Sequence, residues 1–218
     1  MKVSWLGHAC FLIEGGGVRV LTDPYDESLD YCTPDPVVDV VTVSHEHFDH
    51  NAVGRVSGDP TVLRGVGEHD ALGVKFIGIA SFHDDKGGAE RGENTIFSFD
   101  IDGLHVAHLG DLGVPLTKKQ AEDLSSVELL LIPVGGTYTI GPAEAASVVA
   151  SLPAVRVVVP MHFKTDRLGE GFPIAPVDDF AKEMEHVKRI GSSEFTVSKD
   201  DLPPRKEVWI LDYAQSIG

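Results

Sequence analysis

Short runs of apolar and β-branched residues, separated by glycine, proline and aspartate, dominate the first half of the chain. This pattern is typical of β-strands joined by tight turns. The run Val37–Val43 is almost continuously β-branched, as in strands that are buried on both faces. Proline and aspartate mark Asp23–Pro36 as a loop. Strands are predicted at Val3–Leu6, Cys10–Glu14, Val18–Leu21, Val37–Val43, Val74–Ala80, Thr95–Asp100, Leu104–Leu109, Glu128–Val134, Val155–Pro160 and Glu207–Leu211.

Helical signals are concentrated in the second half of the chain. Thr117 and Gln120 have the spacing of a capping box, and Pro142 stands at the first position of a helix that continues over Ala143–Leu152. Pro176–Ile190 has an acidic start and a basic end, which predicts a third helix. Hairpins followed by alternating strands and helices indicate an α/β protein with two β-sheets. No linker, repeat or low-complexity segment interrupts residues 1–218, so one domain is expected.

The charge balance narrows the classes of partner. Lys and Arg number 18 against 34 Asp and Glu, a formal net charge of −16, and this argues against nucleic-acid and membrane partners. No segment approaches 18 uncharged apolar residues, and the first residues lack a signal-peptide pattern, so a cytoplasmic protein is expected. Cys10 and Cys32 are predicted to be free thiols. The oligomeric state stays open, and a homo-oligomer is compatible with the sequence.

The strongest chemical signal directly follows the Val37–Val43 strand. His45, His47, Asp49 and His50 place four candidate metal ligands within six residues. In so tight a loop the first two side chains can face one point while the last two face a second, about 3.5–4 Å away, which is the separation of metal ions in two-metal hydrolytic sites. Imidazole and carboxylate ligands without thiolate favour zinc, with manganese, iron and nickel as alternatives.

Three more candidate ligands also follow predicted strands. His83 follows Val74–Ala80, and Asp111 and His162 come after two later strands. Side chains at the ends of neighbouring strands converge at one edge of a sheet, where open α/β folds bind ligands. A polar, solvated loop is the alternative interpretation of the histidine cluster, but it does not explain why ligand types recur at strand ends.

The series His-x-His-x-Asp-His, a lone His, Gly-Asp and a late His resembles the motifs of the metallo-β-lactamase-fold hydrolases, and the resemblance covers the whole chain. The segments Trp5–Ala9, His108–Gly113 and Pro133–Thr139 look most like the small bacterial branch related to ascorbate-phosphate lactonase. The resemblance implies an α/β fold, a four-layer αββα sandwich, with a dinuclear metal site at one edge.

Carried over to this chain, the family pattern implies two divalent metal ions. The implied ligands are His45, His47 and His83 for the first ion, Asp49, His50 and His162 for the second, and Asp111 between them. Asp49 and Asp111 are thereby the expected catalytic residues. His108 is the alternative to His83 as the third ligand of the first ion. His8 and His108 are expected either to hydrogen-bond a ligand or to bind metal themselves. His69, His105 and His186 are expected to take no part.

Three further features suggest an anionic small-molecule substrate. Arg91 lies in a glycine-rich loop just after His83, Tyr138 follows a Gly-Gly pair, and Lys164 follows His162 closely. Each either contacts substrate or serves only the local chain. A hydroxide bridging the two metals would hydrolyse a small ester, lactone or phosphodiester. The alternatives are a ribonuclease-like phosphodiesterase of the same fold and a non-hydrolytic metal-binding protein. The negative charge and the lack of an RNA-binding insertion weigh against the first, and the lack of a redox domain against the second.

Overall fold

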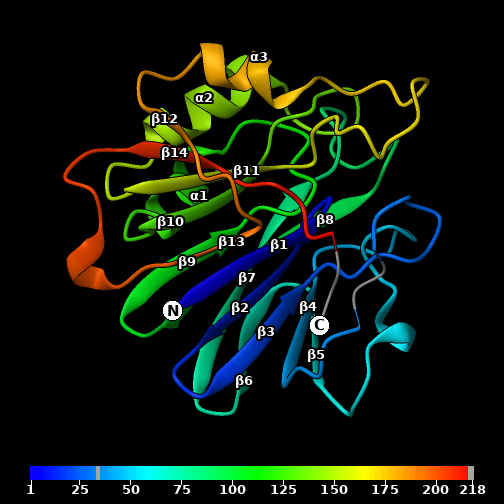
Figure 1. Cartoon of the computed structure of the whole chain (residues 1–218), viewed down its shortest axis with the longest axis vertical. Helices are drawn as coiled ribbons and strands as arrows, with labels where there is room; N and C mark the ends of the chain where they lie inside the picture. Colours follow the sequence, from blue (N-terminus) through cyan, green and yellow to red (C-terminus); the bar gives the residue numbers. More distant parts are fainter. Residues whose placement is uncertain (33–34, 216–218) are drawn as a thin grey trace.

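The computed structural model describes residues 1–32 and 35–215, and its strands form two β-sheets (Figure 1). The six-stranded sheet has the order β13-β1-β2-β3-β4-β5, and the eight-stranded sheet has the order β12-β14-β11-β10-β9-β8-β7-β6. The strands of the first are β1 (Lys2–Gly7), β2 (Cys10–Gly15), β3 (Val18–Thr22), β4 (Val40–Val43), β5 (Thr61–Arg64) and β13 (Glu194–Thr196). Those of the second are β6 (Gly67–Ala71), β7 (Val74–Phe82), β8 (Glu93–Ile101), β9 (Leu104–His108), β10 (Leu129–Pro133), β11 (Val157–Met161), β12 (Val187–Arg189) and β14 (Glu207–Ile210).

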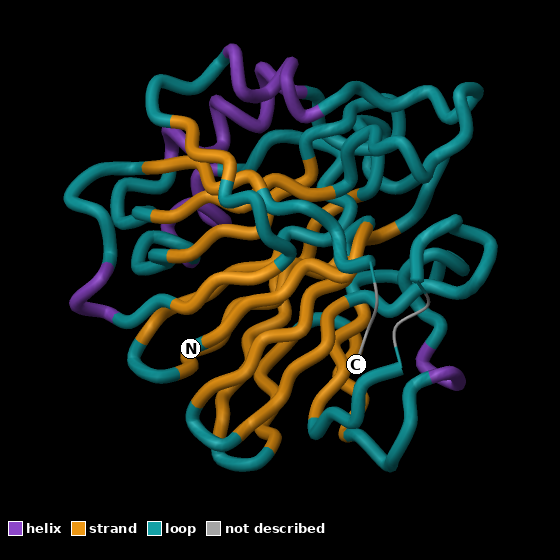
Figure 2. Tube along the Cα trace, viewed as in Figure 1, coloured by secondary structure: helices purple, strands orange, loops and turns teal. Residues whose placement is uncertain are grey.

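The three α-helices are short and lie beside the eight-stranded sheet, as Figure 2 shows for the purple segments in its upper half. They are α1 (Lys118–Asp123), α2 (Pro142–Ser151) and α3 (Val177–Lys182), and the 3₁₀ helices η1 (Val53–Arg55) and η2 (Lys199–Asp201) complete the described elements. The outer face of the six-stranded sheet is covered mainly by loops, whose Tyr25, Leu29 and Ile174 side chains share an apolar cluster with Leu12 and Val41 of that sheet. None of the described helices has the length and apolar character needed to cross a membrane.

The two sheets enclose the main hydrophobic core. Phe11 and Ile13 of β2 share this core with Phe97 and Phe99 of β8, and all four side chains are almost completely buried. Alternation along the hairpin strands explains the arrangement, because one face of each strand is apolar and turns toward the other sheet. The α/β sandwich implied by the sequence is confirmed.

Strand direction decides where the site can lie. In the six-stranded sheet β1, β3 and β4 run the same way, because β2 is antiparallel to both β1 and β3 while β3 and β4 are parallel. In the eight-stranded sheet β7, β9, β10 and β11 run the same way for the same kind of reason. The carboxyl ends of each set therefore meet at one edge of their sheet, and loops leaving these ends can share a site.

Most predicted elements are present with shifted ends. Thr117 and Gln120 form the capping box of α1, and Pro142 begins α2. The predicted strand Val37–Val43 is a strand only over Val40–Val43, and Val37 is exposed. Thr33 and Pro34 of the predicted loop lie outside the described residues.

The predicted helix Pro176–Ile190 is wrong in its second half. The helix ends at Lys182, and Val187–Arg189 instead form strand β12, which pairs with β14. Residues 187–189 form backbone hydrogen bonds with β14 at the edge of the sheet. This pairing stabilises a strand more than the local side-chain pattern of this segment stabilises a helix. Strands β5, β6 and β13, which the apolar pattern did not indicate, are likewise held by pairing with neighbouring strands.

Candidate metal centre

The loop after β4 and the end of β7 bring together three histidines from the two sheets. His45 and His47 belong to the loop that begins at Ser44, and His83 directly follows β7. His45 Nε2 lies 3.0 Å from His47 Nδ1. One ring nitrogen from each of the three side chains lies within 4.8 Å of the other two, so these residues could hold one metal ion.

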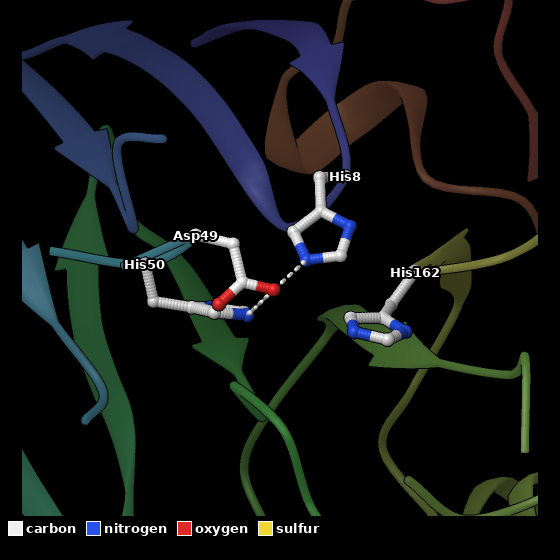
Figure 3. Close-up of side chains that lie close together, drawn as sticks. All are labelled: His8, Asp49, His50 and His162. Carbon is white, nitrogen blue, oxygen red and sulfur yellow. Dashed lines mark hydrogen bonds and ion pairs between the residues drawn. The ribbon is translucent and has the colours of Figure 1, made fainter. Parts of the chain in front are cut away.

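A second group lies next to the first. His8, in the turn between β1 and β2, joins Asp49 and His50 of the β4 loop and His162, which directly follows β11. Figure 3 shows the four side chains converging, with the Asp49 carboxylate between the rings of His8 and His50. The contact atoms of this group also lie within 4.8 Å of one another.

Asp111 stands between the two groups. Its Oδ2 lies 3.2 Å from His83 Nε2 and 3.3 Å from both His50 Nε2 and His162 Nε2. Asp111 is held by the backbone before it: Gly110 has a positive φ of 54°, and a Cβ there would lie only 2.4 Å from Asn94 Oδ1. Asn94 Oδ1 in turn accepts a hydrogen bond from the Asp111 N–H at 2.9 Å. A residue larger than glycine at position 110 would collide with Asn94, so Gly110 allows the Asp111 carboxylate to reach the centre.

A buried carboxylate fixes the orientation of two of these histidines. Asp23, at the end of β3, accepts hydrogen bonds from the Ser44 N–H at 2.8 Å, the Ser44 hydroxyl at 2.6 Å and His50 Nδ1–H at 2.9 Å. Because the Ser44 hydroxyl donates to Asp23, its oxygen accepts from His45 Nδ1–H at 2.9 Å. Both His45 and His50 therefore use Nδ1 for these hydrogen bonds and turn Nε2 toward the centre, where it can bind a metal.

Burial favours the neutral form of three of the imidazoles. It lowers the pKa of His45 to about 3 and of His8 to about 4, and it also lowers the pKa of His83. Burial acts in the same direction on His50, but the Asp111 and Asp23 carboxylates outweigh it and hold the His50 pKa well above its usual value. A metal ion at His50 Nε2 would take the place of that proton.

The donor set fits divalent metal ions. Six buried side-chain nitrogen or oxygen atoms in the described residues lack a hydrogen-bond partner, and five of them belong to this centre: His8 Nδ1, His50 Nε2, His83 Nδ1, Asp111 Oδ1 and His162 Nδ1. Buried polar atoms are normally paired, and a metal ion would provide the missing partner of His50 Nε2, which faces Asp111 at the centre. At metal–ligand distances of roughly 2.0–2.2 Å, neighbouring ligands of one ion stand roughly 3–3.5 Å apart. The distances from Asp111 Oδ2 to three imidazole nitrogens match this spacing.

His108, the alternative to His83 as a ligand of the first ion, is turned away from the centre. Its Nε2–H donates to the Ala9 carbonyl at 2.8 Å, and its Nδ1 accepts from the Gly110 N–H at 3.3 Å. Both ring nitrogens are therefore used to link the β1–β2 turn to the segment before Asp111. His69, His105 and His186 are absent from the candidate metal groups of the described residues.

A cavity of about 350 Å³ opens beside the centre. Of the predicted substrate residues, Arg91 and Tyr138 line it, and the Arg91 guanidinium lies 5.6 Å from the centre of the Tyr138 ring. Lys164 has a different contact: its ammonium group donates to the carbonyl oxygens of Gly169 and Phe172 and so holds its own loop. The lining residues are His47, Phe48, Asp49, His83, Arg91, Asp111, Tyr138, His162 and Phe172.

The loop that carries Arg91 is organised by one carboxylate. Asp84 accepts hydrogen bonds from the backbone N–H groups of Lys86, Gly88, Glu90 and Arg91 at 2.7–2.9 Å. Burial acts to raise the pKa of Asp84, but these four donors outweigh it and lower the pKa to about 2. The charged carboxylate thus fixes the backbone position of Arg91 above the cavity.

Sequence analysis missed four contributors. Asp23 and Asn94 orient ligands through hydrogen bonds, whereas Phe48 and Phe172 line the cavity. Asp23 directly follows a strand, as the candidate ligands His83 and His162 do, but its local sequence is that of an ordinary turn. Phe48 stands inside the histidine motif and is 63% exposed, so an exposed aromatic in a ligand loop was a usable signal.

Comparisons with known proteins show the family of the chain. The family model of the β-lactamase superfamily domain matches residues 2–162. A metal-dependent hydrolase of Methanoregula boonei is 32% identical over 188 residues, covering 76% of this chain and 83% of the relative. One from Pyrobaculum aerophilum is 28% identical and covers 87% and 94%.

A solved structure of a metallo-β-lactamase superfamily protein from Thermotoga maritima is 38% identical, with a TM-score of 0.82, and covers 98% of this chain and 99% of the other. The match therefore extends over both sheets and over every element that supplies a histidine or aspartate to the centre. The chain belongs to the metallo-β-lactamase superfamily, in a family of metal-dependent hydrolases.

Proposed function

We propose that the protein is a hydrolase that uses two divalent metal ions to cleave a small ester, lactone or phosphodiester that carries an anionic group. The preferred metal in this proposal is zinc. The supporting observation is the position of Asp111, whose Oδ2 faces three imidazole nitrogens at 3.2–3.3 Å between two groups of candidate ligands. In this proposal His45, His47 and His83 hold the first ion, Asp49, His50 and His162 hold the second, and Asp111 contacts both. Manganese, iron and nickel accept the same ligands.

When bound, two such ions lower the pKa of a coordinated water toward neutrality and polarise the carbonyl or phosphoryl oxygen of the substrate. Asp49 is the residue that orients the attacking water by accepting a hydrogen bond from it. Burial acts to raise the pKa of Asp49, but the hydrogen bond from His8 and the His50 ring outweigh it, so the pKa is lowered and the carboxylate is charged at neutral pH. A charged carboxylate beside the cavity is the state that this task requires.

The cavity supports a small anionic substrate. Arg91 supplies the positive charge, and Phe48, Tyr138 and Phe172 supply aromatic walls that exclude water. The chain carries a net charge of −16, so an anion needs local positive charge to bind. A volume of about 350 Å³ suits a small molecule, and the lactone class follows from the resemblance to ascorbate-phosphate lactonase.

The proposal is tested by metal analysis and a substrate panel. Protein purified without chelator is expected to contain two metal equivalents, and reloaded protein to hydrolyse one of a set of phosphodiesters, lactones and esters. A chain that binds no metal after reconstitution refutes the proposal. Metal binding without hydrolysis of any panel member favours a non-hydrolytic metal protein, and activity confined to RNA favours the ribonuclease-like alternative.

The substrate class has its own test. Arg91→Ala is expected to raise the KM for an anionic substrate at least about 10-fold, the loss of one hydrogen bond to a charged group, and to leave a neutral ester of the same shape nearly unchanged. Arg167→Ala is the matched control, because Arg167 also stands over a tyrosine ring, at 5.7 Å from Tyr213, and is absent from the cavity lining. Equal effects of Arg91→Ala on both substrates contradict an anionic substrate.

A further inference from the structure

We propose that His8 is itself a ligand of the second metal ion, in addition to Asp49, His50 and His162. This assignment rests on the dinuclear site proposed above. It goes further because it adds a ligand from the β1–β2 turn, a part of the chain far from the histidine motif in sequence.

The position of the ring carries the assignment. His8 Nε2 lies 3.2 Å from Asp49 Oδ2, the spacing of two neighbouring ligands on one ion. The ring centre of His8 lies 4.2 Å from that of His162 and 5.0 Å from that of His50. Figure 3 shows that the His8 ring points into the same space as the other three side chains.

The state of the imidazole is suited to a metal. His8 is 1% exposed, and its Nε2 faces the Asp49 carboxylate at 3.2 Å, where an imidazole nitrogen can bind a metal ion. Its contacts repeat those of two other candidate ligands: in His8, His83 and His162 the Nε2 faces a carboxylate of the centre, and the Nδ1 has no partner in the described residues.

The backbone at His8 is built to hold this side chain. His8 has a φ of +52°, a left-handed conformation that costs a residue with a Cβ about 1–2 kcal/mol. Its carbonyl accepts two hydrogen bonds, from Trp5 Nε1–H at 3.0 Å and from the His162 N–H at 3.2 Å. His162, with a φ of +51°, has the same conformation. Glycine or asparagine would form such a turn at lower cost, so a histidine here indicates that the imidazole is required.

The competing role is that of a positioning residue, in which His8 Nε2–H only donates a hydrogen bond to Asp49. The two roles differ in magnitude and in spectroscopic signature. Removing a hydrogen-bond partner of a ligand typically costs 10–100-fold in metal affinity, whereas removing a ligand costs more and changes the coordination of the ion. His8→Asn is the variant of choice, because asparagine tolerates the left-handed backbone and is too short to reach the ion.

The experiment titrates metal-free full-length protein with Co²⁺ and follows the visible absorption of each bound ion. In His8→Asn we expect the second Co²⁺ to bind more than about 100-fold more weakly, with a changed spectrum, while the first Co²⁺ binds as in the wild type. Added imidazole should restore the second spectrum in His8→Gly, in which the vacated side chain leaves room for it. His105→Ala is the control for removing a histidine, because the half-buried His105 contacts Ser98 and Ser126 and no candidate ligand.

The outcomes separate the two proposals. If the wild type binds two Co²⁺ ions and His8→Asn does so with an affinity within 100-fold and an unchanged spectrum, His8 is not a ligand and the dinuclear site stands. If the wild type binds fewer than two ions, the dinuclear site fails, and the assignment of His8 fails with it. Circular dichroism of each metal-free variant shows whether it is folded, and the imidazole rescue in His8→Gly tests the assignment independently of His8→Asn.

Discussion

Replacing Asp23 with asparagine should weaken both metal sites although it removes no ligand. The Asp23 carboxylate receives three hydrogen bonds, from the Ser44 N–H, the Ser44 hydroxyl and His50 Nδ1–H. An amide keeps one accepting oxygen and introduces an NH₂ group, so at least one donor meets another donor. If the oxygen stays with the Ser44 N–H, the NH₂ group faces His50 Nδ1, and His50 must move its proton to Nε2, the nitrogen that faces the metal centre.

The expected loss follows from the connections of Asp23. Removing a hydrogen-bond partner of a ligand lowers metal affinity by about 10–100-fold, which corresponds to about 1.4–2.8 kcal/mol. Asp23 orients His50 directly and His45 through Ser44. The metal affinity of both sites should therefore fall, each within this range. The metal-free protein should also lose about 1.5–3 kcal/mol of unfolding free energy, since a buried hydrogen bond to a charged group is broken.

Competition with a coloured chelator measures the two Zn²⁺ affinities, and the ¹⁵N chemical shifts of the histidine rings report which nitrogen of His50 is protonated. Asp39→Asn is the matched control, because Asp39 Oδ2 accepts the Arg19 N–H at 2.7 Å and contacts no candidate ligand. Unchanged affinities at both sites, together with a proton that stays on His50 Nδ1 in Asp23→Asn, would refute the reasoning.

Four other substitutions test the site from different directions. Asp49→Ala should abolish hydrolysis while the metal-free protein stays folded by circular dichroism, because this carboxylate lies in a loop outside the hydrophobic core; near-normal turnover would exclude its catalytic role. In His83→Ala the affinity for one metal ion, measured by chelator competition, should fall far more than 100-fold. His108→Ala should instead lower the unfolding free energy by about 2 kcal/mol or more, since both of its ring nitrogens are hydrogen-bonded, and the reverse ranking would exchange their roles. Asp84→Asn should destabilise the protein at neutral pH, because the pKa of Asp84 is lowered from 3.8 to about 2 on folding. The stabilisation by this carboxylate is complete above the unfolded pKa and is lost as the pH falls toward 2, so denaturant unfolding should show the difference between wild type and variant shrinking below about pH 4, and a constant difference would contradict the assignment.

The sequence predicted the parts of the site that depend on local order. His45, His47, Asp49 and His50 follow a buried strand in so short a segment that any fold keeps them together. Which strands run parallel could not be deduced from spacing alone, yet the assumption that ligands cluster at strand ends held for His83, Asp111 and His162 too. The reason is physical, because loops leaving parallel strands at one edge have few other directions available.

The role of Asp23 could not be predicted in the same way. Thr22-Asp23-Pro24 has the composition of an ordinary turn, and the partners of Asp23 are 21 and 27 residues away. Lys164 illustrates the opposite case: closeness to His162 in sequence suggested contact with substrate, but the carbonyl oxygens of residues 169 and 172 bind its ammonium group. A side chain of that length reaches many acceptors, so sequence distance alone does not determine its contact.

The two sheets contribute unequal and complementary halves of the centre. The six-stranded sheet supplies His8, Asp23 and the β4 loop, and the eight-stranded sheet supplies His83, Asp111 and His162. Each half alone buries polar atoms that its own sheet cannot pair, and buried polar groups left partly satisfied are destabilising. Metal ions bound between the halves would satisfy His50 Nε2, which faces the centre, and would link the sheets at their shared edge. A ligand whose free concentration is 1,000 times its Kd stabilises the folded state by about 4.1 kcal/mol. Metal binding at this centre should therefore contribute to stability as well as to catalysis.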